Sequence, residues 1–303
     1  MRKVIALTVA ASLLVALAGC TASAPSGDCV PTGTPGEASK LVTATGAFDS
    51  SPTVDFPTPL VTKGLEVSVI SKGDGRLVRD TDIVTFHYTQ FDAETGEVIA
   101  ATAPFTSSVD GEDNLKALFQ CVTVGSRVAA TLPAPANEDI TAVLVIDIDV
   151  AYTSKATGRI EIPQAGLPSV VTAPDGQPGV TILDEDPPTA LKYATLITGD
   201  GKKVKSGDTL LVQYTAFDWD TSSVIATTWG QDDNSLRQIV LSKFDSTTSE
   251  GVSAGALTAL SGKTVGSQVL VVMPASTWEG ASDITGTSGA TIVVVYDILG
   301  IVE

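Results

Sequence analysis

The side chains that most often carry enzyme chemistry are scarce in this chain of 303 residues, which has one histidine and three cysteines. A triad of serine, histidine and aspartate would have to use His87, because it supplies the sole imidazole. His87 precedes Tyr88 on an alternating strand, and we expect it to be exposed on the face opposite the core. The cysteines are far apart and lack zinc-type spacing. The residues therefore predict no metal and no cofactor.

Carboxylates are more abundant, and Asp184, Glu185 and Asp186 form a run that could hold calcium weakly. Two prolines follow at once and EF-hand spacing is absent, so we interpret the run as a solvated linker. The net charge of -17, with no cluster of basic residues to neutralise phosphates, argues against nucleic acid as a partner.

The elements that must position any site occur twice in the sequence. A shift of 126 residues places residues 65–102 on residues 191–228 without a gap, and 15 of 38 positions are identical. A diverged internal duplication explains this match. In the second copy, apolar residues alternate from Leu210 to Ala216, which predicts a half-buried strand with Tyr214 facing the core.

Alternation also predicts the strand that closes the first copy, with Leu144 to Val150 inward at every second residue and Asp147 and Asp149 outward. Residues 115–122 are expected to form a short helix. The offset between the copies grows to 150 residues at Asp147, which matches Asp297. The second copy therefore carries the longer loops, and the first copy is trimmed.

The N-terminus has a basic start before an apolar run over residues 4–18, which is too short for a settled transmembrane helix and is typical of an export signal. The tetrapeptide Leu-Ala-Gly-Cys that ends at Cys20 resembles a bacterial lipobox. This resemblance implies that signal cleavage makes Cys20 the first residue of the mature protein and that a lipid is attached to it. The alternative is an ordinary signal peptide with an incidental cysteine. Acyl chains anchor at about 0.8 kcal/mol per buried CH₂. We expect the mature protein to be tethered to the outer face of the cytoplasmic membrane.

Residues 20–40 are rich in Ser, Thr, Gly and Pro, which predicts a flexible spacer. Cys29 lies in this spacer, and Cys121 lies in the predicted short helix. Because an exported protein meets an oxidising environment, these cysteines either pair and pin the spacer to the first domain, or remain free with Cys121 buried.

These features predict five segments. They are a signal peptide at residues 1–19, a spacer at 20–40, a trimmed first domain at 41–155, a linker with a lead-in strand at 156–189, and a second domain at 190–303.

The order of motifs in the second copy resembles FKBP-type peptidyl-prolyl cis-trans isomerases, and specifically the tandem-domain lipoproteins of high-GC Gram-positive bacteria. The motifs are Gly207-Asp208, Gln213-Tyr214-Thr215, Leu260-Ser261-Gly262, Val265-Gly266-Ser267 and the final strand over residues 290–300. The resemblance covers residues 190–302 strongly and residues 64–152 more loosely. It implies an α+β fold of two tandem FKBP-like domains, each an antiparallel sheet wrapped around a short helix.

The resemblance also implies an activity. FKBP-type enzymes speed the rotation of X-Pro bonds, which crosses a barrier of about 20 kcal/mol. They do so in an apolar cleft without nucleophile, metal or cofactor. The implied substrates are proline-containing segments of exported polypeptides, and we expect a monomer with the second domain as the working copy.

Carrying the family's pocket over, position by position, assigns the site to Tyr214, Ile225, Val252, Ser253, Ala256, Trp278 and Val294. Further substrate contacts are assigned to Trp219, Trp229 and Glu279. The family's tryptophan floor is replaced by Ala256, and its two phenylalanines by Ile225 and Val294. The lost aromatic area predicts weakened activity. The alternatives are a peptide-binding or chaperone module without turnover, and a spacer that presents a partner.

Overall fold

The computed structural model describes residues 29–48, 50–110, 113–133, 141–182, 184–230, 236–278 and 289–302. Within these ranges no helix is both long and apolar enough to cross a membrane. The predicted signal peptide at residues 1–19 and the predicted lipid attachment at Cys20 lie outside them.

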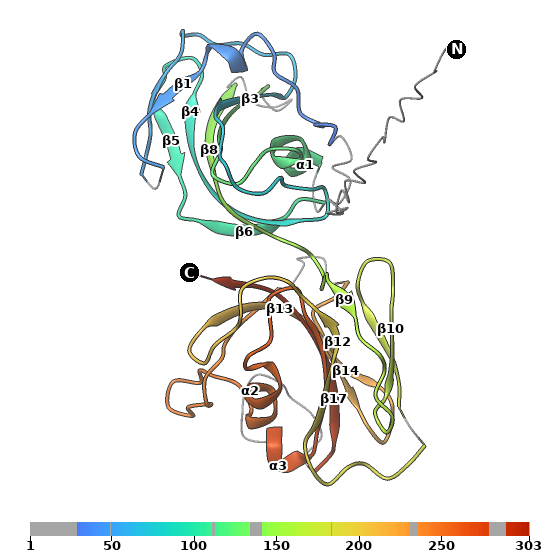
Figure 1. The fold of residues 1–303 in the computed structure, drawn as a ribbon. Coiled ribbons are helices and arrows are strands. Elements are labelled where there is room, and N and C mark those ends of the chain that lie inside the picture. The colour runs from blue at the N-terminus through green and yellow to red at the C-terminus, as the bar shows by residue number, and fades with distance from the viewer. Residues whose placement is uncertain are drawn as a thin grey trace, which may run out of the picture.

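The described chain consists mostly of antiparallel strands with few helices, arranged around two separate cores (Figure 1). The N-terminal half contains η1 (Ser39–Leu41), β1 (Thr43–Thr45), β2 (Thr53–Asp55), β3 (Glu66–Ser71), β4 (Ile83–Asp92), β5 (Val98–Ala101), β6 (Phe105–Ser108), α1 (Asp113–Phe119), β7 (Arg127–Leu132) and β8 (Ala142–Tyr152). The C-terminal half contains β9 (Arg159–Ile160), β10 (Ser169–Thr172), β11 (Pro178–Thr181), β12 (Lys192–Thr198), β13 (Thr209–Asp218), β14 (Val224–Thr227), β15 (Arg237–Val240), α2 (Ala254–Leu260), β16 (Gln268–Met273), α3 (Ala275–Trp278) and β17 (Ile292–Val302).

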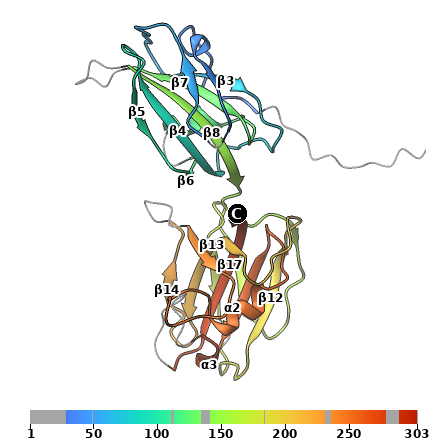
Figure 2. The same ribbon diagram turned by 90° about the vertical axis from the view of Figure 1, so that its left-hand side faces the viewer.

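The two large sheets share one order of strands. It is β3-β7-β8-β4-β5 in the N-terminal half, with β6 pairing β4. In the C-terminal half it is β12-β16-β17-β13-β14, with β15 pairing β13 and β9 added beyond β12. Helix α1 lies inside the curve of the first sheet and α2 lies on one face of the second (Figures 1 and 2). Each half is therefore an antiparallel sheet curved around a short helix.

The central strand β13 is buried on both faces, which corrects the expectation of a half-buried strand. Leu210 and Tyr214 point into the core beneath α2, as alternation predicted. On the other face, Leu211 and Phe217 are only 2% and 6% exposed. A small hairpin covers Phe217 on this second face, and Leu211 packs with Tyr152 of the N-terminal half.

Each half has such a covering hairpin, β1–β2 in the first and β10–β11 in the second. Apolar residues of β10–β11 pack against the outer face of the C-terminal sheet, and those of β1–β2 do the same in the N-terminal half. The pairs Thr43–Asp55 and Ser169–Thr181 differ by the same 126 residues as the sequence repeat. Residues 156–189, predicted as a linker, thus belong largely to the packed C-terminal half.

The described part of the predicted spacer is also packed. The Glu66 carboxylate accepts hydrogen bonds from the backbone amides of Ala38 and Ser39, each at 2.9 Å. Both residues are buried against the sheet. Residues 29–41 are therefore part of the N-terminal half and do not form a free tether.

The cysteine pairing that the sequence left open is present, because Cys29 and Cys121 form a disulfide across a sequence separation of 92 residues. A cross-link of this span stabilises by about 2–4 kcal/mol, chiefly by restricting the unfolded chain. It ties the first described residue of the chain to the segment that follows α1.

A β-bulge in β8 changes the predicted direction of Val150. Thr85 pairs with Val150 and Phe86 pairs with Ile148, which leaves Asp149 as the extra residue. A single extra residue shifts the phase of the following side chains. Val150, predicted inward, is consequently 38% exposed.

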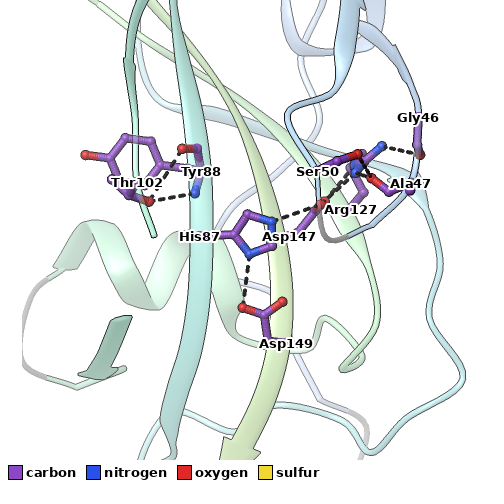
Figure 3. A network of polar contacts seen from close by, with 9 residues as sticks. All are labelled: Gly46, Ala47, Ser50, His87, Tyr88, Thr102, Arg127, Asp147 and Asp149. Atoms are coloured by element: carbon purple, nitrogen blue, oxygen red, sulfur yellow. Dashed lines mark hydrogen bonds and ion pairs between the residues drawn. The ribbon is translucent and has the colours of Figure 1, made fainter. Parts of the chain in front are cut away.

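The outer face of the N-terminal sheet carries a row of charged groups (Figure 3). Arg127 Nε and Nη2 each lie 2.6 Å from an oxygen of Asp147. His87 follows, with Nδ1 3.1 Å from Asp149 and Nε2 3.4 Å from Asp147. The ring of Phe48 packs edge-on against it. The His87 side chain is 15% exposed, so the expectation of an exposed histidine is wrong: two carboxylates and a phenyl ring enclose it.

The C-terminal half has a counterpart of this row in which the neutral Gln268 takes the place of Arg127. Gln268 Nε2 donates to Asp297 at 2.8 Å, and the Ala156 amide donates to the other carboxyl oxygen at 2.8 Å. Burial raises the pKa of Asp297 to about 6, although both hydrogen bonds and the charge of Lys155 favour the ionised form.

Replacing Asp297 with asparagine should remove a pH dependence of stability. An acid whose pKa is raised by folding binds more protons folded than unfolded between pH 3.8 and about 6, so stability falls as pH rises through this window. The shift corresponds to roughly 2–3 kcal/mol. Urea unfolding from pH 4 to pH 7 should show the fall in the native chain and in the exposed control variant Glu94→Gln, and a clearly smaller fall in Asp297→Asn, where only other groups such as Asp149 contribute. The same fall in Asp297→Asn would contradict this assignment.

Candidate functional site

The pocket residues predicted in the C-terminal half gather beneath α2, but they fill the space there. Tyr214, Val252, Ala256 and Val294 belong to one apolar cluster, and Ile225 packs against it. Tyr214 is 8% exposed, and Val252, Ala256 and Val294 are at most 1% exposed. The grouping is as the family resemblance implies, whereas side chains this buried cannot line an open cleft.

Trp278 explains much of this closure. It lies on α3, which packs against α2, and it belongs to the same cluster as Ala256. Its side chain is 6% exposed, and its Nε1 donates to the carbonyl of Ala290 at 3.0 Å. Trp278 thus adds side-chain volume to the cluster from α3.

Ser253 also has a structural role in this half. Its Oγ accepts a hydrogen bond from the Ala256 amide at 3.3 Å and so caps the N-terminus of α2. The side chain is buried, with 2% exposure. Ser253 is therefore a cap beneath the cluster and does not face solvent.

The remaining predicted contacts lie elsewhere. Trp219 packs on the opposite face of the sheet, against the covering hairpin, and its Nε1 donates to the Glu185 carbonyl at 3.2 Å. Trp229 lies against Gly176, in the turn of that hairpin. Both are 6% exposed, and both pack against the hairpin rather than on the concave face. Glu279 lies outside the described residues.

An open apolar hollow lies instead in the N-terminal half. A cavity of about 390 Å³ opens between α1 and the concave face of the sheet. Its lining consists of Phe86, Tyr88 and Gln90 from β4, Phe105 and Ser107 from β6, Asn114, Leu115 and Leu118 from α1, Leu132 from β7, and Ala142, Leu144 and Ile146 from β8. No charged side chain is among these described residues.

Aromatic rings form one wall of the hollow. The centroid of Phe105 lies 4.3 Å from that of Phe86 and 6.2 Å from that of Tyr88, the second pair being nearly perpendicular. Phe86 in turn packs on Phe119 of α1. Tyr88 is held through its backbone amide, which donates to Thr102 Oγ1 at 3.1 Å (Figure 3). Phe105 is 41% exposed, so this wall is accessible to a ligand.

Matching pairs of strands show why the two halves differ. Phe86 pairs with Phe105 across β4 and β6, and the equivalent pair across β13 and β15 is Val212 with Arg237. The N-terminal half thus has two aromatic rings where the C-terminal half has a valine and an arginine. None of the residues that the structure describes in the N-terminal half corresponds to Trp278.

Sequence reasoning placed the cleft in the second copy, because that copy matches the family motifs more fully. The signal for the first copy was present: Phe86 lies two residues before Tyr88 and so shares its face. The hollow provides an apolar surface of defined shape, and no charged side chain is among its described lining residues. Among the described residues, no cluster of three or more histidine, cysteine or carboxylate side chains could hold a metal.

No protein-family model matches the chain, and no curated protein matches it. Among solved structures, the three FKBP domains of wheat FKBP73 align with 79% of this chain and 95% of their own, at 16% identity and a TM-score of 0.31. FkpA from Escherichia coli aligns with 44% of this chain and 51% of its own, at 20% identity and 0.30. A putative peptidyl-prolyl isomerase FKBP12 from Mycobacterium tuberculosis aligns with 40% and 93%, at 21% identity and 0.28. These TM-scores and identities are too low to transfer a function to this chain, so the function is inferred from the geometry.

Proposed function

We propose that the protein is an FKBP-type peptidyl-prolyl cis-trans isomerase of weakened activity, and that the N-terminal hollow receives X-Pro segments of exported polypeptides. The observation that carries this proposal is the open, uncharged hollow between α1 and the concave sheet, walled by Tyr88, Phe105 and Leu144. A proline ring and its apolar neighbours would lose water on entering it, which favours binding.

The chemistry needs no reactive side chain. Planarity of the peptide bond comes from resonance that places partial charges on its oxygen and nitrogen. A dry apolar surface solvates this planar form less well than water does and so favours the twisted form, in which the resonance is lost. Helix α1 presents Leu115 and Leu118 to the hollow and no indole, so the contact area offered to a proline ring is limited. Slow turnover is the expected result.

The wider proposal is a lipoprotein of two tandem FKBP-like domains, anchored through Cys20 at the outer face of the cytoplasmic membrane and monomeric. Its support is the lipobox-like sequence and the shared strand order of the two halves. In this arrangement the N-terminal domain is the working copy, and the C-terminal domain has a filled core.

Phe105→Ala should lower kcat/KM for a Leu-Pro-Phe peptide by about tenfold, because the accessible ring supplies a large part of the hollow's contact area. Exchange between cis and trans peptide, measured by NMR with the whole chain, reports the rate. The matched control is Val98→Ala, which truncates a 60% exposed residue of β5 outside the hollow and should leave the rate unchanged. No acceleration by the native protein would reject the isomerase.

Binding without turnover is the second candidate, and the leucine floor of the hollow favours it. In that case the same peptide shifts the resonances of the N-terminal half, the shifts weaken in Phe105→Ala, and exchange stays at the uncatalysed rate. Absence of both binding and acceleration would reject the hollow as a peptide site.

A further inference from the structure

A second cavity, separate from the hollow, lies where the two halves meet. Its volume is about 570 Å³, within the range of small-ligand sites. Strands β4, β6 and β8 form its N-terminal walls, and β13, β15 and β17 form its C-terminal walls. Figure 1 shows β6 and the C-terminal end of β17, which both contribute lining residues, facing each other at the junction.

Direct contact between the halves holds these walls in place. The ring of Tyr152, at the end of β8, lies so close to Gly300 of β17 that a Cβ there would meet Cδ1 at 2.2 Å. Ile83, Leu211 and Leu299 complete a small buried cluster with Tyr152. The cavity is thus a built feature of the packed junction.

The lining of the cavity is mixed. Val150, Leu211 and Val302 supply apolar surface, while Gln238 offers an amide. Among the described lining residues, Asp149 is the only charged one. A single carboxylate in a mostly apolar cavity favours a cationic partner over a neutral one.

Asp149 is already held in position from behind. Its Oδ2 lies 3.1 Å from His87 Nδ1, and its side chain is 23% exposed. The other ring nitrogen of His87 faces Asp147, whose charge is compensated by Arg127. Arg127 and Asp147 are paired with each other, whereas the Asp149 carboxylate lines the cavity. Burial, with a smaller contribution from Asp147, raises the pKa of Asp149, and His87 opposes the shift.

The C-terminal half shows that the fold does not require this arrangement. There the bulge residue equivalent to Asp149 is Leu299, and the residue equivalent to His87 is Gln213. Leu299 is buried with 2% exposure. The carboxylate and the histidine are therefore additions of the N-terminal half, at the point where its outer face meets the junction cavity.

We propose that the junction cavity binds an alkylammonium or guanidinium group, with Asp149 as the counter-ion and His87 as the residue that positions it. A lysine or arginine side chain of a polypeptide and a free diamine share this chemistry. The site is independent of the proposed isomerase, since it lies on the outer face of the sheet and the hollow lies on the inner face.

Titration of the whole chain with three probes tests the site. Nα-acetyl-lysine N-methylamide should bind about tenfold more tightly than the neutral analogue Nα-acetyl-norleucine N-methylamide, because only the ammonium group can pair with the Asp149 carboxylate and donate hydrogen bonds to it. Asp149→Asn should abolish that preference. The control Glu94→Gln removes one exposed carboxylate at a distant turn and should keep it. Val150→Phe, which fills the cavity without changing charge, should weaken all probes.

The third probe, cadaverine, distinguishes the sources. Binding as tight as that of the lysine derivative assigns a free amine, and weaker binding assigns a peptide side chain; either supports the ammonium site. Equal affinities of the lysine and norleucine derivatives for the native chain would overturn the proposal, as would an undiminished preference in Asp149→Asn. Should Val150→Phe fail to fold, the near-isosteric Asp149→Asn decides alone.

Discussion

Replacing Arg127 with methionine should lower the free energy of unfolding of the N-terminal half by about 3–5 kcal/mol. The guanidinium is 5% exposed, holds Asp147 through two contacts of 2.6 Å, and donates to the carbonyls of Gly46 and Ala47 at 3.2 and 2.9 Å. Methionine removes the charge and all four donors. Asp147 is then a buried carboxylate with only His87 nearby, and the loop after β1 loses two hydrogen bonds.

Chemical unfolding of the two halves, followed through resonances of each, measures this loss. The matched control is Gln268→Met, which removes the equivalent but neutral side chain of the C-terminal half. It should lower the free energy of unfolding by less than Arg127→Met does. The double variant Arg127→Met/Asp147→Leu should recover most of the stability, because apolar replacement of both partners leaves no uncompensated charge. A cost below about 1 kcal/mol for Arg127→Met would mean that the ion pair is not what fixes the loop.

Local pattern was sufficient for the parts of the fold whose signal is periodic. Tyr214 faces the core as alternation predicted, because side chains of a strand point to opposite faces in turn. The short helix expected over residues 115–122 is found at Asp113–Phe119. Sequence predicted these elements because each is decided by neighbours along the chain.

The outer faces of the sheets could not be predicted in the same way. Strands β1 and β2 lie within the predicted first domain, but each has only three residues, which is too short for a periodic signal. They become ordered because Ala44 and Val54 find apolar partners on the outer face of the sheet. Only the 126-residue offset, extended upstream of residue 65, could have indicated a second hairpin.

The charged row around His87 was missed for a related reason. His87, Arg127 and Asp147 come from three different strands and meet only through the order of the sheet. An outward-facing histidine on an isolated strand is normally exposed. Here the loop that carries Phe48 returns over it, and no local signal announces that return.

The choice between the two copies shows a limit of matching residues to a family. Counting lost aromatics identifies what is missing from a cleft, but whether the space stays open depends on total side-chain volume. In the C-terminal half the volume is restored by Trp278 and Tyr296, which belong to one buried cluster. In the N-terminal half, Leu115 and Leu144 remain only partly buried, and the hollow stays open.

Trp278→Ala should therefore both destabilise the C-terminal half, by about 3–5 kcal/mol, and create a second apolar hollow in it. The indole is 6% exposed and bonded to the Ala290 carbonyl, and Ala256 beside the vacated space is too small to fill it. Trp278→Phe, which keeps most of the ring, should cost clearly less.

Two readouts separate the effects of Trp278→Ala. Urea unfolding reports the lost stability, and titration with the Leu-Pro-Phe peptide reports the stoichiometry, which should rise from one site per chain to two. In the double variant Phe105→Ala/Trp278→Ala, the peptide should bind tightly only at the new site of the C-terminal half, because binding in the N-terminal hollow is weakened. If Trp278→Ala keeps full stability and single-site binding, the C-terminal core is closed by other residues, and Trp278 is not the side chain that separates a filled copy of this fold from an open one.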